Sequence, residues 1–237
     1  MKRIAVLLLA LLLLTVVGCT QTKQQSEPVV EKPEEEPAVE TVVEPVYVYE
    51  KAEKNYLEPV LDFSWEREHA PEIVMVHFTS AVVNHRDDPY NPDHVRQIFI
   101  DYDLSIHYVI LRDGTIQCYI PEDRVAWHAG KGEYNNDPRY TNAMNHYAIG
   151  IEILAMGSES DMSIYLTPGE YRALDDSLKG YTDAQYEALR GLVADICQRN
   201  NIPMDRQHVI GHEDYSPGKT DPGELFDWDR LLGEMTT

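Results

Sequence analysis

Two short apolar runs, each next to or around a single ionisable residue, most constrain how this chain can fold. Residues 73–76 are continuously apolar and rich in β-branched side chains, and His77 follows them directly. Residues 148–155 have the same character but contain Glu152. Such runs are typical of strands buried on both faces of a sheet. A glutamate inside a buried strand is costly unless it is paired, for example with an arginine, or functional, so Glu152 is a candidate general base.

A third stretch, residues 207–223 with the sequence QHVIGHEDYSPGKTDPG, begins as a strand and continues as a loop rich in Gly and Pro. The side chains of His212 and Asp221 in this loop suit zinc. Lys219 lies two residues before Asp221, on the same side of an extended backbone, where an ammonium group could stabilise negative charge on a substrate oxygen. A catalytic zinc site usually has three protein ligands, and His77 is the best candidate for the third.

Turn and capping signals place a hairpin and helices between these strands. Asp-Gly at 113–114 between two apolar runs predicts a β-hairpin. Asn-Pro at 91–92 predicts the start of a helix, and capping-box spacing at Thr167 and Thr182 predicts two more, the first ending at Gly180. Strands interleaved with helices predict an α/β domain with a mixed central β-sheet flanked by helices on both faces.

The composition of the N-terminal part of the chain predicts that the protein is exported and that a tether precedes its folded domain. Residues 1–19 combine a basic start with an apolar segment shorter than a membrane span, which ends at Gly18-Cys19 like a bacterial lipobox. We therefore expect a lipoprotein signal peptide and lipidation at Cys19, with an ordinary secretion signal as the alternative. Residues 20–58, rich in Glu and Pro, predict an extended tether. Residues 59–237 are then the catalytic domain.

Charge and cysteine content limit the partners of this domain. The formal net charge of the chain is −21, which argues against nucleic acid as a partner held by charge. After Cys19, only Cys118 and Cys197 remain. Their separation cannot be read from the sequence, so a disulfide stays open, although we favour two buried free thiols. We expect a monomer.

Six motifs occur in the order found in the zinc-dependent N-acetylmuramoyl-L-alanine amidases of the type-2 family, which includes the peptidoglycan-recognition proteins. They are VHFTS, IHYVILRDGTI, AWHAG, IGIEI, YTDAQYEAL and GHEDYSPGKTDPG. This resemblance covers roughly residues 70–230, in which the segment 156–180 looks longer than usual for the family. The resemblance implies that His77, His212 and Asp221 bind Zn²⁺. It further implies that Glu152 is the general base and Lys219 stabilises the oxyanion.

Other residues of these motifs are candidates for substrate contacts or for the core. The resemblance places Trp127 and His128 at the wall of the substrate cleft, although Trp127 is also a reasonable core residue. His107 is more easily explained as a packed core histidine than as a support of the site. His85 stands in a polar loop, where a solvated side chain is a better explanation than a metal ligand.

The resemblance implies an enzyme that cleaves the amide bond between N-acetylmuramic acid and L-alanine in peptidoglycan or muropeptides. A peptidoglycan receptor of the same fold, which binds without cutting, is the alternative. Together with the N-terminal signal, this predicts a membrane-anchored lipoprotein of the bacterial cell envelope that faces the periplasm or the exterior.

The predicted lipid anchor can be tested by one substitution. The sulfur of Cys19 would carry the lipid, so Cys19→Ala should abolish labelling by a fatty-acid probe and move the protein out of the membrane fraction. Lipid labelling that persists in Cys19→Ala would contradict the lipobox interpretation.

Overall fold

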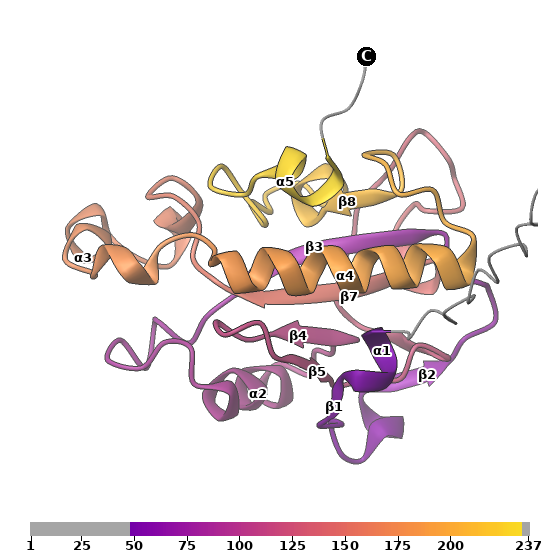
Figure 1. Ribbon diagram of the computed structural model, residues 1–237, viewed down its shortest axis with the longest axis horizontal. Coiled ribbons are helices and arrows are strands. Elements are labelled where there is room, and N and C mark those ends of the chain that lie inside the picture. The colour runs from indigo at the N-terminus through magenta and orange to yellow at the C-terminus, as the bar shows by residue number, and fades with distance from the viewer. Residues whose placement is uncertain (1–47, 234–237) are drawn as a thin grey trace, which may run out of the picture. The chain divides into compact units, whose positions relative to one another are not determined.

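A mixed six-stranded sheet organises the residues that a computed structural model describes, 48–233 (Figure 1). The strand order is β1-β5-β4-β7-β3-β8, and within this sheet only the β4–β5 pair is antiparallel. The strands are β1 (Glu53–Lys54), β3 (Ile73–Thr79), β4 (Tyr108–Ile110), β5 (Ile116–Cys118), β7 (Ala148–Leu154) and β8 (Val209–Gly211). Strands β2 (Ser64–Glu66) and β6 (Arg124–Ala126) form a separate antiparallel pair.

Helices cover both faces of this sheet, which confirms the predicted α/β fold. They are α1 (Val48–Lys51), α2 (Pro92–Asp101), α3 (Pro168–Arg172), α4 (Asp183–Asn200) and α5 (Trp228–Leu232). Short 3-10 turns lie at Val60–Asp62, Met144–His146, Asp161–Ile164, Asp176–Leu178 and His212–Asp214. The predicted caps are present, because the Asn91 side chain accepts from the first turn of α2 and Thr182 forms a capping box at the start of α4.

The predicted helix from Thr167 to Gly180 was wrong in its length. Helix α3 starts at Pro168 with the expected capping box but ends at Arg172. The side chain of Asp175 then accepts a hydrogen bond from the Ser177 backbone N–H at 2.8 Å, and a separate 3-10 turn follows. An aspartate that binds nearby backbone in this way favours a cap over a helix interior.

Successive side chains along β3 and β7 point to opposite faces of the sheet. Val74 and Val76 of β3 pack in the core cluster that includes Leu189 and Val193 of α4, which lies over the sheet in Figure 1. Ile73 and Met75 belong to a different cluster, together with parts of the loop between β6 and β7. His77, two residues beyond Met75, therefore lies on the face opposite α4.

The domain begins earlier than the predicted boundary at residue 59. Strand β1 pairs in parallel with β5 at the sheet edge. The side chain of Leu57 is fully buried in the cluster that also contains Phe99 of α2. Arg96 donates a hydrogen bond of 2.7 Å to the carbonyl of Asn55. Residues 48–58 therefore belong to the domain. The predicted leader with Cys19 and the predicted tether up to residue 47 lie outside the described residues.

The two cysteines of the domain are free thiols. Cys118 of β5 and Cys197 of α4 are both buried in the core cluster beneath α4 and form no disulfide. Burial raises the pKa of both thiols, to about 12 for Cys118 and about 11 for Cys197. They act as small apolar core residues with little thiolate character.

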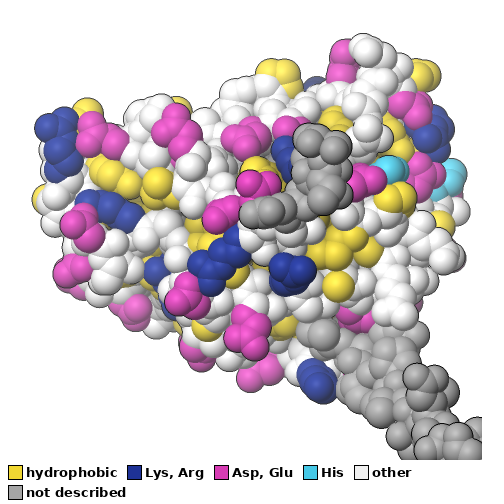
Figure 2. All heavy atoms as spheres, turned by 45° about the horizontal axis from the view of Figure 1, so that its top comes forward, with side chains coloured by type: hydrophobic (Ala, Val, Ile, Leu, Met, Phe, Trp, Pro, Cys, Tyr) yellow, Lys and Arg dark blue, Asp and Glu magenta, His cyan; other side chains and the backbone are white. Residues whose placement is uncertain are grey.

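The surface of the domain carries mixed charge. Figure 2 shows acidic side chains spread over one face with Lys and Arg side chains among them. Several form exposed ion pairs, including Arg86–Glu170, Arg139–Glu72 and Arg172–Glu159. Such pairs contribute little to stability, so the buried core holds the fold. No helix within residues 48–233 is long and apolar enough to cross a membrane.

The placement of residues 48–58 predicts a difference between two nearby leucines. Leu57→Ala should lower the free energy of unfolding by about 2–5 kcal/mol, because the side chain leaves a cavity in the core. Leu61→Ala is the matched control and should change it by less than about 0.5 kcal/mol, because Leu61 is 74% exposed. Urea unfolding measures both. Equal and small effects would show that residues 48–58 do not pack as described.

Candidate active site

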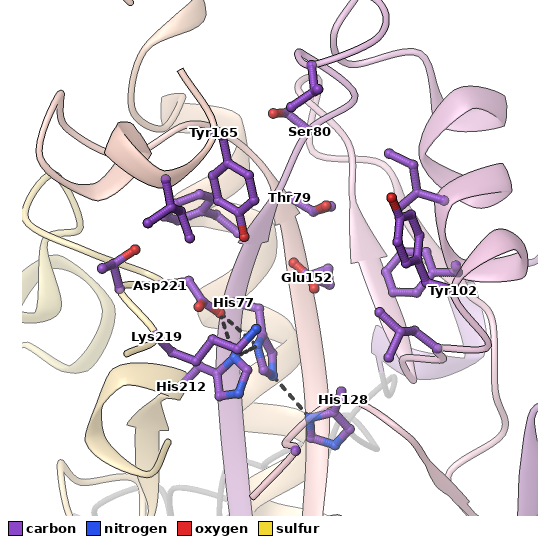
Figure 3. A pocket seen from close by; sticks show the side chains of 18 of the residues that line it. His77, Thr79, Ser80, Tyr102, His128, Glu152, Tyr165, His212, Lys219 and Asp221 are labelled. Carbon is purple, nitrogen blue, oxygen red and sulfur yellow. Dashed lines mark hydrogen bonds and ion pairs between the residues drawn. The ribbon is translucent and has the colours of Figure 1, made fainter. Parts of the chain in front are cut away.

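Three parallel strands bring their carboxyl ends to one edge of the sheet. The β3–β7 register pairs His77 with Glu152, and the β3–β8 register pairs Val76 with Gly211, the residue before His212. Neighbouring strands lie about 4.8 Å apart, so these side chains are close despite their distance in sequence. Figure 3 shows the resulting group at the floor of a cavity.

The structure brings the three predicted metal ligands together. The Nδ1 atoms of His77 and His212 lie 3.1 Å apart. Asp221 Oδ2 lies 2.8 Å from His77 Nδ1 and 3.1 Å from His212 Nδ1. Among residues 48–233 this is the one group of three such side chains whose ligand atoms converge. The spacing is close to the roughly 3.3 Å that separates ligand atoms in a tetrahedral zinc site.

The remaining ring nitrogens of the two histidines are held by other groups. His212 Nε2 lies 2.9 Å from the carbonyl oxygen of Ala129, so this nitrogen carries the proton and donates. His77 Nε2 lies 3.0 Å from His128 Nδ1 and can donate to it. Both Nδ1 atoms then present lone pairs to the shared centre, which is the tautomer that a metal ligand needs.

Burial and charge set the protonation of this group. Burial, followed by the charge of His212, lowers the pKa of His77 to about 4. Burial alone would raise the pKa of Asp221, but hydrogen bonds from His212 and His77 outweigh it and hold the pKa below its usual range. Neutral imidazoles beside an ionised carboxylate suit a cation.

Close packing in the loop after β8 places Asp221 beside His212. The Glu213 backbone N–H donates to the Asp221 carbonyl at 3.0 Å. A Cβ on Gly211 would lie 2.6 Å from Cδ of Pro222, so only glycine fits there. These backbone contacts hold Asp221 close to His212.

Glu152 lies next to the ligand group but is not part of it. Its Oε2 atom is buried without a hydrogen-bond partner in the described part of the chain, so the alternative of pairing with an arginine was wrong for this atom. Burial, and then the charge of Asp221, raises the pKa of Glu152 well above its usual value, although Lys219 lowers it somewhat. An unpaired buried carboxyl group with a raised pKa fits a group that accepts and returns a proton.

A cavity of about 590 Å³ opens above these groups. Lys219 lines it beside Asp221 and His212, with an exposed side chain. Trp127 and His128 line it as expected. His128 Nε2 is buried and has no hydrogen-bond partner among residues 48–233. The volume is in the usual range for a small-molecule site.

Asn145 is a supporting residue that the sequence did not reveal. Its Oδ1 accepts from the backbone N–H groups of His128 (3.1 Å) and Ala129 (2.8 Å). The carbonyl of Ala129 in turn orients His212. Asn145 therefore positions both His128, which lines the cavity, and the predicted ligand His212. No local sequence signal distinguished Asn145 from the other polar residues between β6 and β7.

Two other histidines do not take part in the site. His107 is fully buried, accepts a hydrogen bond from the Gly150 backbone N–H at 3.0 Å and lies 3.1 Å from the carbonyl of Arg124. Burial, and then the charge of Arg67, lowers its pKa to about 3. It is a packed core histidine, as favoured. The ring of His85 stacks on that of His94 with centroids 3.6 Å apart and does not line the cavity.

The raised pKa of Glu152 predicts how stability depends on pH in metal-free protein. An unfolded glutamate ionises near pH ~4.3, whereas folded Glu152 keeps its proton to higher pH. The folded state then holds the extra proton, so stability falls as pH rises above ~4.3. Glu152→Gln removes this loss and should melt at a higher temperature than the parent at pH 8, but not at pH 4. An equal difference at both pH values would contradict the raised pKa.

Comparison with known proteins agrees with this geometry. The family model described as N-acetylmuramoyl-L-alanine amidase (Amidase_2) matches residues 67–224. The 1,6-anhydro-N-acetylmuramyl-L-alanine amidase AmpD of Enterobacter cloacae is 36% identical over 135 residues, which are 56% of this chain and 58% of that protein. The N-acetylmuramoyl-L-alanine amidase AmiD of Escherichia coli is 33% identical over 114 residues, 47% of this chain and 35% of that protein. The matches thus span less than two thirds of these relatives.

Solved structures share the fold. A crystal structure of an AmpD selenomethionine derivative superposes with a TM-score of 0.52 at 27% identity, covering 76% of this chain and 92% of that one. The complex of Escherichia coli AmiD with anhydro-N-acetylmuramic acid-L-Ala-D-γ-Glu-L-Lys superposes with a TM-score of 0.51 at 24% identity, covering 69% of this chain and 56% of that one. At this identity, the similarity shows a shared fold alone. Because the family model covers most of the chain, the protein belongs to the N-acetylmuramoyl-L-alanine amidase family.

Proposed function

We propose that this protein is a zinc-dependent hydrolase that cleaves the amide bond between N-acetylmuramic acid and L-alanine. The observation that carries this proposal is the convergence of His77, His212 and Asp221 beside the unpaired carboxyl group of Glu152. A ligand group and a separate proton acceptor at one cavity floor are what hydrolysis of an amide requires.

The residues present fit zinc. Two imidazole nitrogens and one carboxylate oxygen are a common donor set of catalytic zinc sites. Their three acceptor atoms point at one another within 3.1 Å, which is unfavourable unless a cation or proton lies between them. His77, His212 and Asp221 would hold the ion. Zinc bound there would supply Lewis-acid chemistry, which acidifies water and polarises a carbonyl group.

The remaining steps fall to Glu152 and Lys219. The carboxylate of Glu152, which lines the cavity, would take a proton from the attacking water and pass it to the leaving nitrogen of L-alanine. The Lys219 ammonium group, which lines the same cavity, would stabilise the negative charge that develops on the carbonyl oxygen. His128 and Trp127, which both line the cavity, would contact the substrate, and Trp127 would supply a flat apolar surface.

We further propose an anhydro-muropeptide among the substrates. The names of AmpD and the ligand in the AmiD complex both include an anhydro-N-acetylmuramyl group. The cavity volume suits a sugar with part of its peptide. Attachment to the membrane through a lipid at Cys19, facing the periplasm or the exterior, is part of the same proposal, and the Cys19→Ala variant tests it.

Zinc content and amide cleavage measured side by side on the parent and four variants test the proposed roles. Glu152→Gln should keep zinc and muropeptide binding but lose about 10²–10⁴-fold in turnover, because the proton acceptor is gone. His77→Ala should lose both zinc and turnover. Lys219→Ala should keep zinc and lower kcat more than it raises KM. His85→Ala is the control and should match the parent, because His85 lies outside the cavity.

Two results would overturn parts of this proposal. Cleavage by Glu152→Gln at the parent rate would mean that Glu152 is not the proton acceptor. A zinc-loaded parent that binds muropeptide and never releases the peptide would identify a receptor instead of an enzyme.

A further inference from the structure

The segment between β7 and α4, Met156–Gly180, builds one wall of the cavity. It leaves and rejoins the domain at one point, where Met156 and Gly180 form an antiparallel bridge and the Gly180 N–H donates to the Met156 carbonyl at 2.8 Å. Three of its residues, Met162, Leu166 and Tyr171, are buried in a small apolar cluster that also contains Val82. The wall is therefore an ordered part of the domain, in a segment whose role the sequence left open.

Asp161 ties this wall to the loop that carries the metal ligand Asp221. The side chain of Asp161 is 5% exposed, and its Oδ2 accepts from the backbone N–H of Ser158 at 2.7 Å and of Glu224 at 3.1 Å. Its carbonyl accepts from the Thr220 hydroxyl at 3.2 Å. The wall and the metal-ligand loop are thus fixed relative to each other by hydrogen bonds on both sides of Asp221.

Glycines on both segments make room for this carboxylate. A Cβ on Gly157 would lie 2.6 Å from Asp161 Oδ2, and one on Gly223 would lie 2.5 Å from the same atom. Gly223 also has a φ of +78°, which favours glycine. Both Gly157 in the wall and Gly223 in the metal-ligand loop therefore leave the space that the Asp161 carboxylate occupies.

This wall directs Tyr165 into the cavity. Figure 3 shows its hydroxyl group pointing to the end of the cavity where Glu152 and Asp221 lie. Burial, and then the charges of Asp221 and Glu152, raises the pKa of Tyr165. The phenol therefore stays a neutral hydrogen-bond donor at neutral pH.

The Tyr165 hydroxyl has no partner within the described residues, unlike other tyrosines around the wall. The hydroxyl of Tyr171 donates to the Gly157 carbonyl at 2.8 Å, and that of Tyr181 donates to the Pro222 carbonyl at 2.6 Å. A tyrosine that is half exposed, aimed into a cavity and unpaired is available to a ligand.

Apolar side chains gather around the same opening. Most of the exposed large hydrophobic residues within 48–233 line this cavity, namely Val83, Tyr102, Leu104, Ile164 and Tyr165. Tyr102, at the end of α2, faces the cavity from the wall opposite Tyr165 (Figure 3). Exposed apolar groups concentrated at one opening mark a contact surface. Among the described residues that line the cavity, the acidic and basic ones are Glu152, Asp221 and Lys219; the rest of the lining has no Asp, Glu, Lys or Arg, so an uncharged part of a ligand fits there.

We propose that Tyr165 is a substrate-contacting residue, whose hydroxyl donates a hydrogen bond to a neutral oxygen next to the scissile amide while its ring and Ile164 pack against the uncharged muramoyl group. This rests on the proposed function. The segment 156–180 is then a specificity wall that orients the amide above Glu152. The contact is made in the ground state and in the transition state alike, so its loss affects substrate binding more than the chemical step.

Tyr165→Phe tests the proposal, because it removes the donor and keeps the ring. Calorimetry with zinc-loaded protein would measure Kd for an anhydro-muropeptide analogue in which a methylene replaces the scissile N–H. Kd and KM should rise about 3- to 10-fold, as expected for one neutral hydrogen bond, with kcat, zinc content and Tm unchanged. Tyr165→Ala should weaken binding further. Tyr147→Phe is the matched control and should equal the parent, since Tyr147 is half buried, has an unpaired hydroxyl within 48–233 and does not line the cavity.

The outcomes separate the two proposals. Cleavage by the parent together with unchanged Kd and KM in Tyr165→Phe would overturn the role of Tyr165 and leave the amidase intact. A higher Kd in Tyr165→Phe would support the contact even if the parent binds without cleaving. A parent that neither binds the analogue nor cleaves the muropeptide would overturn both.

Discussion

Parallel pairing of β3 with β7 on one side and with β8 on the other holds the reactive side chains at one sheet edge. The pairing places His77 beside Glu152 and delivers His212 directly after Gly211. A slip of one residue in the β3–β7 register would turn His77 or Glu152 to the face covered by α4. The apolar residues that alternate with them are therefore as necessary to the site as the reactive groups, because they fix that register.

The site contains electrostatic interactions that destabilise the folded protein, and the packing of the rest of the domain offsets them. The three acceptor atoms of His77, His212 and Asp221 repel one another in the absence of a cation or proton. The carboxyl group of Glu152 is buried without a partner in the described chain, and its raised pKa means that its ionised form disfavours the folded protein. The buried clusters on both faces of the sheet stabilise the fold against this cost. Such local conflict is expected where a chain binds a metal and moves protons.

Local sequence signals predicted the central strands, the main helix starts and the candidate site residues. The apolar runs around His77 and Glu152 identify buried strands because burial on both faces demands uninterrupted apolar side chains. Thr182 identifies the start of α4, because a capping box satisfies backbone groups within a few residues. The candidate ligands His212 and Asp221 stand in a loop whose Gly and Pro residues hold it locally. These features depend on near neighbours, so the sequence contains them.

Only the tertiary structure decided which distant segments complete the domain and the cavity. A two-residue strand such as β1 has no periodicity, and it forms because β5, more than 60 residues later, offers an edge. Asn145 and Tyr165 are ordinary polar residues in the sequence. They gain roles because long-range contacts bring Asn145 under the loop at residues 127–129 and hold the wall that carries Tyr165 against the metal-ligand loop. Long-range hydrogen bonds and packing carry no local pattern, which is why the sequence alone left these residues unassigned.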